Sequence, residues 1–165
     1  MKEVCINLHI GDDFDCEICS VIPDYSIVHA CQTCHEHGIR QKGRISSTSP
    51  LKLVYETDSH LYLNLLDVPQ EYSPEFANPI FKRTMQFIHR EIQHKQVLIH
   101  CNWGLSRSPS FGLVYMAIIG ALPNASLKDA LAPFIKIYPK YAPGTGVGYY
   151  MEHNWDFLMH KTIKL

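Results

Sequence analysis

A cysteine, an arginine and a serine occur in one segment at a spacing that suits phosphate chemistry. An apolar strand pattern ends at His100, and Cys101 follows it; after five intervening residues come Arg107 and Ser108. A tight loop at a helix N-terminus directs backbone N–H groups at a phosphate dianion, and a guanidinium group can bind two of its oxygens. The same positive field favours a thiolate, which can attack a bound phosphorus. The segment therefore predicts phosphoryl transfer with Cys101 as the nucleophile, although an isolated cysteine at a strand end is more often an ordinary buried thiol.

The elements around this segment indicate an α/β fold. Alternating and β-branched residues predict strands at residues 4–10, 26–30, 61–66 and 96–100. Helical spacing predicts helices at residues 76–92, 108–119 and 147–158, the first of them beginning at either Pro74 or Pro79. Ser126 and Asp129 resemble a capping box, which begins a further helix that Pro133 can interrupt. We therefore expect a central mixed, mostly parallel sheet flanked by helices.

Composition excludes several classes of function. The chain has 165 residues with 15 Lys/Arg against 16 Asp/Glu, a net charge of −1. This balance argues against nucleic acid or an anionic membrane as partner, and no apolar run reaches the roughly 18 residues of a membrane span. The N-terminus lacks the features of a signal peptide, so the cysteines are expected to be reduced. We expect one domain, residues 1–165, that is a cytoplasmic monomer and needs no metal or other cofactor.

The run His100-Cys101-x5-Arg107-Ser108 resembles the signature of the cysteine-dependent protein tyrosine phosphatases. The short chain and the run Gly-Leu-Ser-Arg-Ser-Pro-Ser are similar to the dual-specificity branch. Further pieces resemble small bacterial and phage-type members of that branch, at residues 28–31, 63–67, 137–139 and 141–146. The resemblance covers nearly the whole chain. It implies a sheet flanked by helices, a phosphorylated protein as substrate, and two-step hydrolysis through a phosphocysteine.

The resemblance also assigns roles within the segment. Cys101 would be the nucleophile and Arg107 the phosphate clamp, while Ser108 would help the thiolate leave in the second step. His100 would orient the loop and tune the cysteine, although a satisfied buried histidine is the plain alternative. The loop would bind substrate through Asn102, Trp103, Gly104, Leu105, Ser106 and Arg107.

The family also uses a general acid, an aspartate on a loop some thirty residues before the cysteine. Asp67 lies 34 residues before Cys101 and directly after the strand expected at residues 61–66. Glu71 is the competing carboxylate, because a different loop alignment would bring it to the same place. Asp58 precedes the strand and is expected at its wrong end. We therefore predict Asp67 as the proton donor to the leaving oxygen, with an idle loop aspartate as the alternative.

Two loops bear on the choice of substrate. Asn102 and Trp103 occupy positions where phosphoinositide-directed relatives often carry lysines, so an inositol headgroup is not expected. A loop at residues 38–50 carries Arg40, Lys42 and Arg44. These side chains could approach a phosphoprotein, but a solvated basic loop is the more ordinary interpretation.

Two functions from other classes remain open. Cys16-x2-Cys19 and Cys31-x2-Cys34, with histidines beside the second pair, are spaced like the ligands of a structural zinc site. On that interpretation the N-terminal part would be a zinc-stabilised interaction module. Against it, Cys31 follows an apolar strand, and the core is large enough to fold without metal. The other possibility is a pseudophosphatase that binds phosphoproteins without turnover.

Cys31 is also a candidate for redox control. An activated thiolate oxidises first to the sulfenic acid, which a neighbouring thiol can trap as a disulfide. Cys31 and Cys101 each follow a predicted strand, and the resemblance implies that these strands are adjacent and parallel. Strands about 4.8 Å apart fall within the Cα separation that a disulfide tolerates. The hypothesis is a reversible Cys31–Cys101 disulfide, with a buried structural thiol as the alternative.

Overall fold

A six-stranded sheet forms the centre of the part of the chain that the computed structural model describes, residues 1–43 and 45–163. Its strands are β1 (Lys2–Cys5), β2 (Leu8–Gly11), β3 (Tyr25–His29), β4 (Val54–Glu56), β5 (His60–Leu63) and β6 (Gln96–His100). Their order is β1-β2-β6-β3-β5-β4. The inner pairs β2–β6, β6–β3 and β3–β5 are parallel, and the edge strands β1 and β4 pair antiparallel. The predicted mixed, mostly parallel sheet is confirmed.

Strand β6 is central because it is apolar on both faces. Val97, Leu98 and Ile99 are fully buried, as expected for a strand that helices cover on either side. The register pairs His29 of β3 with His100 of β6. The chain therefore leaves both strands at the same edge of the sheet, where Cys31 and Cys101 follow.

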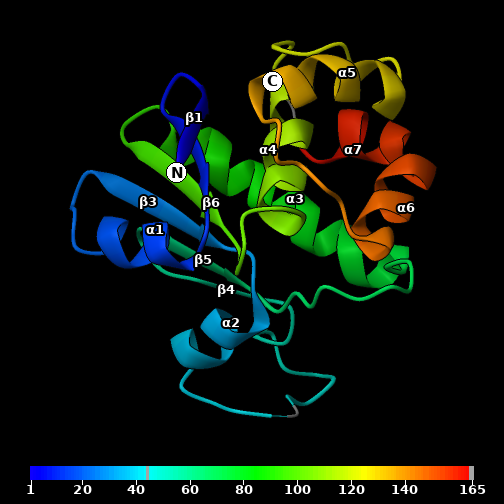
Figure 1. Cartoon of the computed structure of the whole chain (residues 1–165). Coiled ribbons are helices and arrows are strands. Elements are labelled where there is room, and N and C mark those ends of the chain that lie inside the picture. Colours follow the sequence, from blue (N-terminus) through cyan, green and yellow to red (C-terminus); the bar gives the residue numbers. More distant parts are fainter. Residues whose placement is uncertain (44, 164–165) are drawn as a thin grey trace.

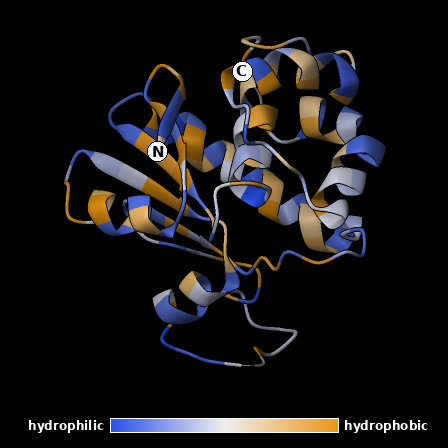
Figure 2. Ribbon diagram, viewed as in Figure 1, coloured by the Kyte–Doolittle hydropathy of each residue, from blue (hydrophilic) through white to orange (hydrophobic). Residues whose placement is uncertain are grey.

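Helices cover the two faces of the sheet unequally (Figure 1). On one face lie α3 (Pro74–Glu91) and α4 (Arg107–Ile118), with α5 (Leu127–Ile137), α6 (Thr145–His153) and α7 (Trp155–Lys161) packed around α4. On the other side, α1 (Asp13–Cys19) contacts β2, β3 and β6, and α2 (Gln32–Gly38) contacts β4 and β5. Every residue of α4 is buried, as its apolar sequence predicts. Apolar residues follow the central strands and the helix sides that face them (Figure 2).

Some predicted elements differ from the observed ones. Residues 4–10 are not one strand but the hairpin of β1 and β2, which turns at Asn7 with a φ of 62°. Strand β5 ends at Leu63, earlier than predicted. The predicted helix at residues 147–158 is two helices, because the backbone of Asn154 leaves the helical region. Two short helices, α1 and α2, were not predicted.

Prolines lie at the start of α3 and in the interior of α3 and α5. Helix α3 begins at Pro74, the first of the two predicted starts, and continues through Pro79. Pro133 likewise lies inside α5 and does not end it, so the expected interruption is wrong. Each interior proline lacks the N–H that would bond to the carbonyl four residues earlier, that of Glu75 or Asp129, so the two helices continue with one intrahelical hydrogen bond fewer. None of the helices in the described ranges is long and apolar enough to cross a lipid bilayer.

Candidate active site

Cys101 lies at the carboxyl end of β6, at the base of the loop that leads into α4. Its side chain is buried, and its Sγ atom lies 3.2 Å from Oγ of Ser108. The same hydroxyl lies 3.2 Å from the carbonyl oxygen of Gly11 and can donate to it. A hydroxyl has one proton, so Ser108 donates either to the carbonyl or to the sulfur. When Cys101 is a thiolate, which can only accept, the proton of Ser108 is available to the sulfur.

The loop is held in shape by residues far along the chain. Gly104 has a φ of 66°, and a Cβ atom there would lie 3.0 Å from the carbonyl oxygen of Gly11. Glycine is therefore favoured at this position both by conformation and by space. Tyr138 donates its hydroxyl proton to the Gly104 carbonyl at 2.8 Å, and the N–H of Ala142 donates to the Leu105 carbonyl at 2.8 Å. The segment around residues 138–142 thus fixes the outer side of the loop.

Arg107 presents a guanidinium group that is held on two sides. The residue is only 6% exposed. Its Nη1 donates to the Leu65 carbonyl at 3.0 Å, and its Nη2 donates to Oδ1 of Asn102 at 2.6 Å. Its Nε has no hydrogen-bond partner and lies 3.7 Å from a carboxylate oxygen of Asp67. An oriented cation with an unused donor suits an oxyanion bound in the loop.

A pocket of about 180 Å³ contains the groups that phosphate chemistry needs. Its lining includes Cys101, Arg107 and Asp67, with Trp103 at 78% exposed on its rim. A Cβ atom on Gly144 would lie 2.5 Å from Oδ1 of Asp67, so a side chain there would displace this carboxylate from its present position. The nucleophile, cation and carboxylate predicted from the sequence therefore line one cavity.

The competing carboxylates lie elsewhere. Glu71 does not line this pocket; its carboxylate accepts a hydrogen bond from Nδ1 of His153 at 2.9 Å when that imidazole is protonated there. Asp58 precedes β5 and is exposed at the end of the strand opposite the pocket. Arg40 and Lys42 lie in the exposed loop after α2 and do not line the pocket. Arg44, the third basic residue of that loop, lies outside the described residues.

His100 lies on the side of β6 opposite the catalytic pocket. It is fully buried, and burial lowers its pKa to about 4, so the ring is neutral at pH 7. Its Nε2 lies 2.8 Å from Nδ1 of His29, whose pKa burial lowers to about 2. Its Nδ1 faces Oδ1 of Asp13 at 3.4 Å. The ring therefore acts as a buried support behind the loop and does not serve as a base toward substrate.

The cysteines of the N-terminal part separate into two places. Cys19 is buried beside Met1, with 3.8 Å between the two sulfur atoms. Cys31 and Cys34 instead lie next to His100, with ligand atoms within 4.8 Å of one another. The four cysteines of the two Cys-x2-Cys pairs therefore do not converge on one point, as the alternative of a structural zinc site would require. Hydrogen bonding from Cys34 lowers the pKa of Cys31.

Several groups that shape the site have no signal in the sequence. The carbonyl oxygens of Gly11 and Leu65 contact Ser108 and Arg107, but any residue supplies a carbonyl. Asp13 accepts a hydrogen bond from Nδ2 of Asn102 at 3.1 Å, and its role depends on the unpredicted helix α1.

Known structures share this architecture. The crystal structure of DUSP15 superposes with a TM-score of 0.66 at 18% identity, covering 98% of this chain and 91% of that one. The crystal structure of a human tyrosine phosphatase-like serine/threonine/tyrosine-interacting protein superposes with a TM-score of 0.64 at 20% identity, covering 95% of this chain and 96% of that one. The crystal structure of a mouse putative dual specificity phosphatase complexed with zinc tungstate superposes with a TM-score of 0.60 at 18% identity, covering 94% of this chain and 86% of that one.

The chain therefore has the fold of the dual-specificity phosphatases, as the sequence resemblance implies. At these identities the similarity establishes the fold alone. No protein-family model matches the chain, and no curated protein sequence matches it. The finer placement among bacterial and phage-type members stays a prediction.

Proposed function

We propose that the chain is a cysteine-dependent phosphatase that hydrolyses phosphomonoesters on proteins: phosphotyrosine, phosphoserine and phosphothreonine, or both classes. The observation that carries this proposal is the shared pocket of Cys101, Arg107 and Asp67 at the N-terminus of α4. A helix N-terminus and a buried guanidinium group attract a phosphate dianion, and the sulfur lies at the base of the same cavity. The fold neighbours support the proposal by analogy.

The first step transfers the phosphoryl group to sulfur. The Cys101 thiolate attacks phosphorus, so that an S–P bond forms and the bond to the ester oxygen breaks. Asp67 gives its proton to the departing oxygen, which leaves as an alcohol or phenol. Arg107 and the loop N–H groups bind the three phosphoryl oxygens as their charge redistributes.

The second step hydrolyses the phosphocysteine. The Asp67 carboxylate, now deprotonated, takes a proton from water as the water oxygen attacks phosphorus. The S–P bond breaks, and the electron pair returns to Cys101, where the Ser108 hydroxyl can donate a hydrogen bond to the thiolate. Inorganic phosphate leaves, and the carboxyl proton and thiolate of the starting state are restored.

The surroundings of the pocket favour a protein substrate. The cavity of about 180 Å³ is small, and exposed Trp103 and Leu105 on its rim offer apolar surface to a peptide. Asn102 and Trp103 supply no positive charge for further phosphates, which disfavours an inositol headgroup. With a net charge of −1, the chain also lacks the basic excess of a nucleic-acid or membrane binder. We infer that residues 1–165 act as one catalytic domain and as a monomer in the cytoplasm.

Turnover of p-nitrophenyl phosphate and of a panel of phosphotyrosine, phosphoserine/threonine and phosphoinositide substrates tests the proposal. We expect hydrolysis of the aryl phosphate and of at least one phosphopeptide class. Cys101→Ser should abolish turnover and retain phosphopeptide binding, because an alcohol is a far poorer nucleophile at neutral pH. Binding of phosphopeptides by the wild-type chain without any turnover would instead support a pseudophosphatase.

A further inference from the structure

The loop that carries Asp67 has no regular secondary structure of its own. Residues 64–73 connect β5 to α3 without forming a helix or a strand. The side chain of Asp67 is 41% exposed, and its carboxylate lies 3.7 Å from Nε of Arg107. That separation is too long for a hydrogen bond, so the carboxylate depends on the backbone around it for its position. Residues 66–72, which include Asp67, are termed the acid loop.

Helix α6 forms hydrogen bonds with the acid loop in both directions. The N–H of Gly146 donates to the Val68 carbonyl at 3.2 Å. The hydroxyl of Thr145 donates to the Pro69 carbonyl at 2.8 Å. In return, the N–H of Tyr72 donates to the Gly146 carbonyl at 3.4 Å. The first N–H groups of a helix have no partner within the helix, so the loop carbonyl satisfies the helix N-terminus while the helix holds the loop.

Gly146 also allows the acid loop to approach the helix closely. A Cβ atom at this position would overlap the carbonyl oxygens of Val68 and Gln70. Two residues further along α6, a Cβ atom on Gly148 would lie 3.8 Å from the Cβ atom of Pro143, which is an ordinary van der Waals contact. The two glycines therefore differ in whether a side chain would displace the acid loop.

Helix α6 is anchored in the core and can serve as a fixed support. Its residues Val147, Tyr150 and Met151 are buried. The hydroxyl of Tyr150 donates to Oδ1 of Asn78 in α3 at 2.6 Å. Close packing makes such a helix stiffer than an irregular loop, so the acid loop takes its position from the helix.

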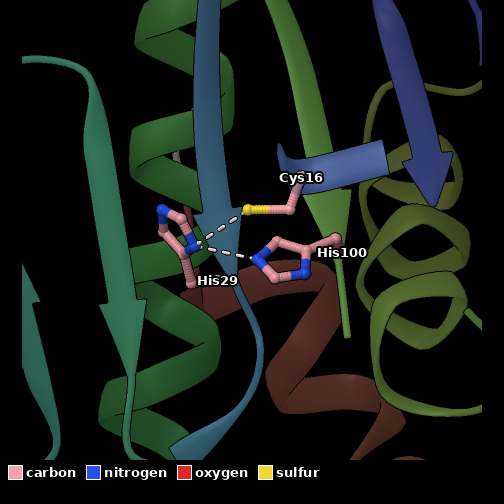
Figure 3. A group of neighbouring side chains, drawn as sticks. All are labelled: Cys16, His29 and His100. Atoms are coloured by element: carbon pink, nitrogen blue, oxygen red, sulfur yellow. Dashed lines mark hydrogen bonds between the residues drawn. The ribbon is translucent and has the colours of Figure 1, made fainter. Parts of the chain in front are cut away.

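The catalytic loop has a support that is separate from α6. His100 of β6 and His29 of β3 lie behind it, with Cys16 of α1 beside them (Figure 3). Nε2 of His100 lies 2.8 Å from Nδ1 of His29. These residues belong neither to α6 nor to the acid loop. A change in the first turn of α6 should therefore shift the proton donor more than the nucleophile.

We propose that Thr145 and Gly146 are positioning residues that hold the acid loop so that Asp67 lies over the pocket. The inference rests on the proposed function, because the phosphatase mechanism is what makes Asp67 the proton donor. Neither Thr145 nor Gly146 lines the pocket, so both act through the backbone of the acid loop. Misplacing a reacting group by about 1 Å can cost about 10²-fold in rate. The loss is largest when the leaving oxygen is strongly basic and needs a proton.

A leaving-group series on the two glycines tests the proposal. For each variant, kcat/KM is measured with phenyl phosphate, whose leaving oxygen needs a proton, and with 2,4-dinitrophenyl phosphate, whose leaving oxygen does not. Gly146→Ala should lower kcat/KM for phenyl phosphate by about 10–100-fold and that for the dinitrophenyl ester by less than about threefold. Gly148→Ala is the matched control, because it brings the same gain in helix propensity, and it should leave both values unchanged.

Thr145→Val removes the hydroxyl donor and keeps the shape of the side chain. This variant should lower kcat/KM for phenyl phosphate by roughly 2–10-fold, the effect of one hydrogen bond, and Thr145→Ser should restore the wild-type value. Circular dichroism checks the fold of each variant, and Thr145→Val carries the test if Gly146→Ala does not fold. Equal losses with both substrates, or an equal loss in Gly148→Ala, would overturn the proposal.

Hydrogen exchange at the Tyr72 amide tests the same contacts without any turnover. This N–H donates to Gly146, so it should be protected in the wild-type chain and exchange faster in Gly146→Ala and Thr145→Val, but not in Gly148→Ala. Protection of the amide without hydrolysis of either substrate would refute the proposed phosphatase activity and still support the held loop. A Tyr72 amide that exchanges as fast as in an unfolded peptide would overturn the proposal.

Discussion

Replacing Ser108 by alanine should slow the breakdown of the phosphocysteine more than its formation. The Ser108 hydroxyl lies 3.2 Å from the Cys101 sulfur in a buried site. A hydrogen bond to a charged group contributes about 1.5–3 kcal/mol. At about 1.4 kcal/mol per factor of ten, its loss should lower the rate of thiolate departure by about 10–150-fold. In the first step the same hydrogen bond stabilises the attacking thiolate before reaction, so its loss does not slow attack to the same extent.

Stopped-flow hydrolysis of p-nitrophenyl phosphate separates the two steps. The Ser108→Ala variant should release a burst of about one equivalent of p-nitrophenol and then turn over slowly, with kcat reduced more than kcat/KM. Ser110→Ala is the matched control, because the Ser110 hydroxyl is also buried but bonds to the Ser106 carbonyl at 2.8 Å and lies 2.9 Å from the Tyr141 hydroxyl. A Ser108→Ala variant in which kcat and kcat/KM fall equally, without a burst, would refute the assignment to the second step.

Three further predictions concern the acid, the clamp and the redox candidate. Asp67→Asn should lower kcat by about 10²–10⁴-fold, most strongly for leaving groups of high pKa. Glu71→Gln is the control and should have a kcat close to that of the wild type. The reverse result in a series of leaving groups would identify Glu71 as the acid. Arg107→Lys should lose both turnover and competitive inhibition by vanadate, since an ammonium group cannot replace the planar fork; unchanged vanadate inhibition would contradict the clamp. Mild peroxide should give an inactive Cys31–Cys101 disulfide that dithiothreitol reverses, and peptide mapping that finds Cys101 only as sulfinic acid would exclude it.

The sequence predicts best what depends on runs of similar residues. Residues 97–99 of β6 and 111–118 of α4 form buried, almost wholly apolar runs, so both elements can be predicted without tertiary information. Helices α1 and α2 have seven residues each, too few for a periodic pattern, and their stability comes from packing against the sheet. The turn at Asn7 was missed because the residues on both sides of it favour strands.

The residues of the active site likewise differ in how well the sequence predicts their positions. Cys101, Arg107 and Ser108 lie within eight consecutive residues, so their spacing alone indicates how they meet. Asp67 reaches the pocket through an irregular loop after β5, and the absence of a side chain on Gly144 leaves it room. Asp67 and Gly144 are 77 positions apart in the sequence, so no local spacing pattern predicts their contact. The approach of His29 to His100 likewise follows from strand order, a property of the whole sheet.

The contacts that hold the catalytic loop set the time at which it can form during synthesis. The loop depends on Gly11 near the beginning of the chain and on Tyr138 and Ala142 near its end. At about 5–20 residues per second, Tyr138 leaves the ribosome about two to seven seconds after Gly104. A nascent chain arrested before Tyr138 has emerged should contain the sheet sequence in full and yet lack phosphate affinity. The thiol of Cys101 thus acquires its binding pocket only after the segment around residues 138–142 has emerged from the ribosome, and until then it is an unassisted cysteine on a nascent polypeptide.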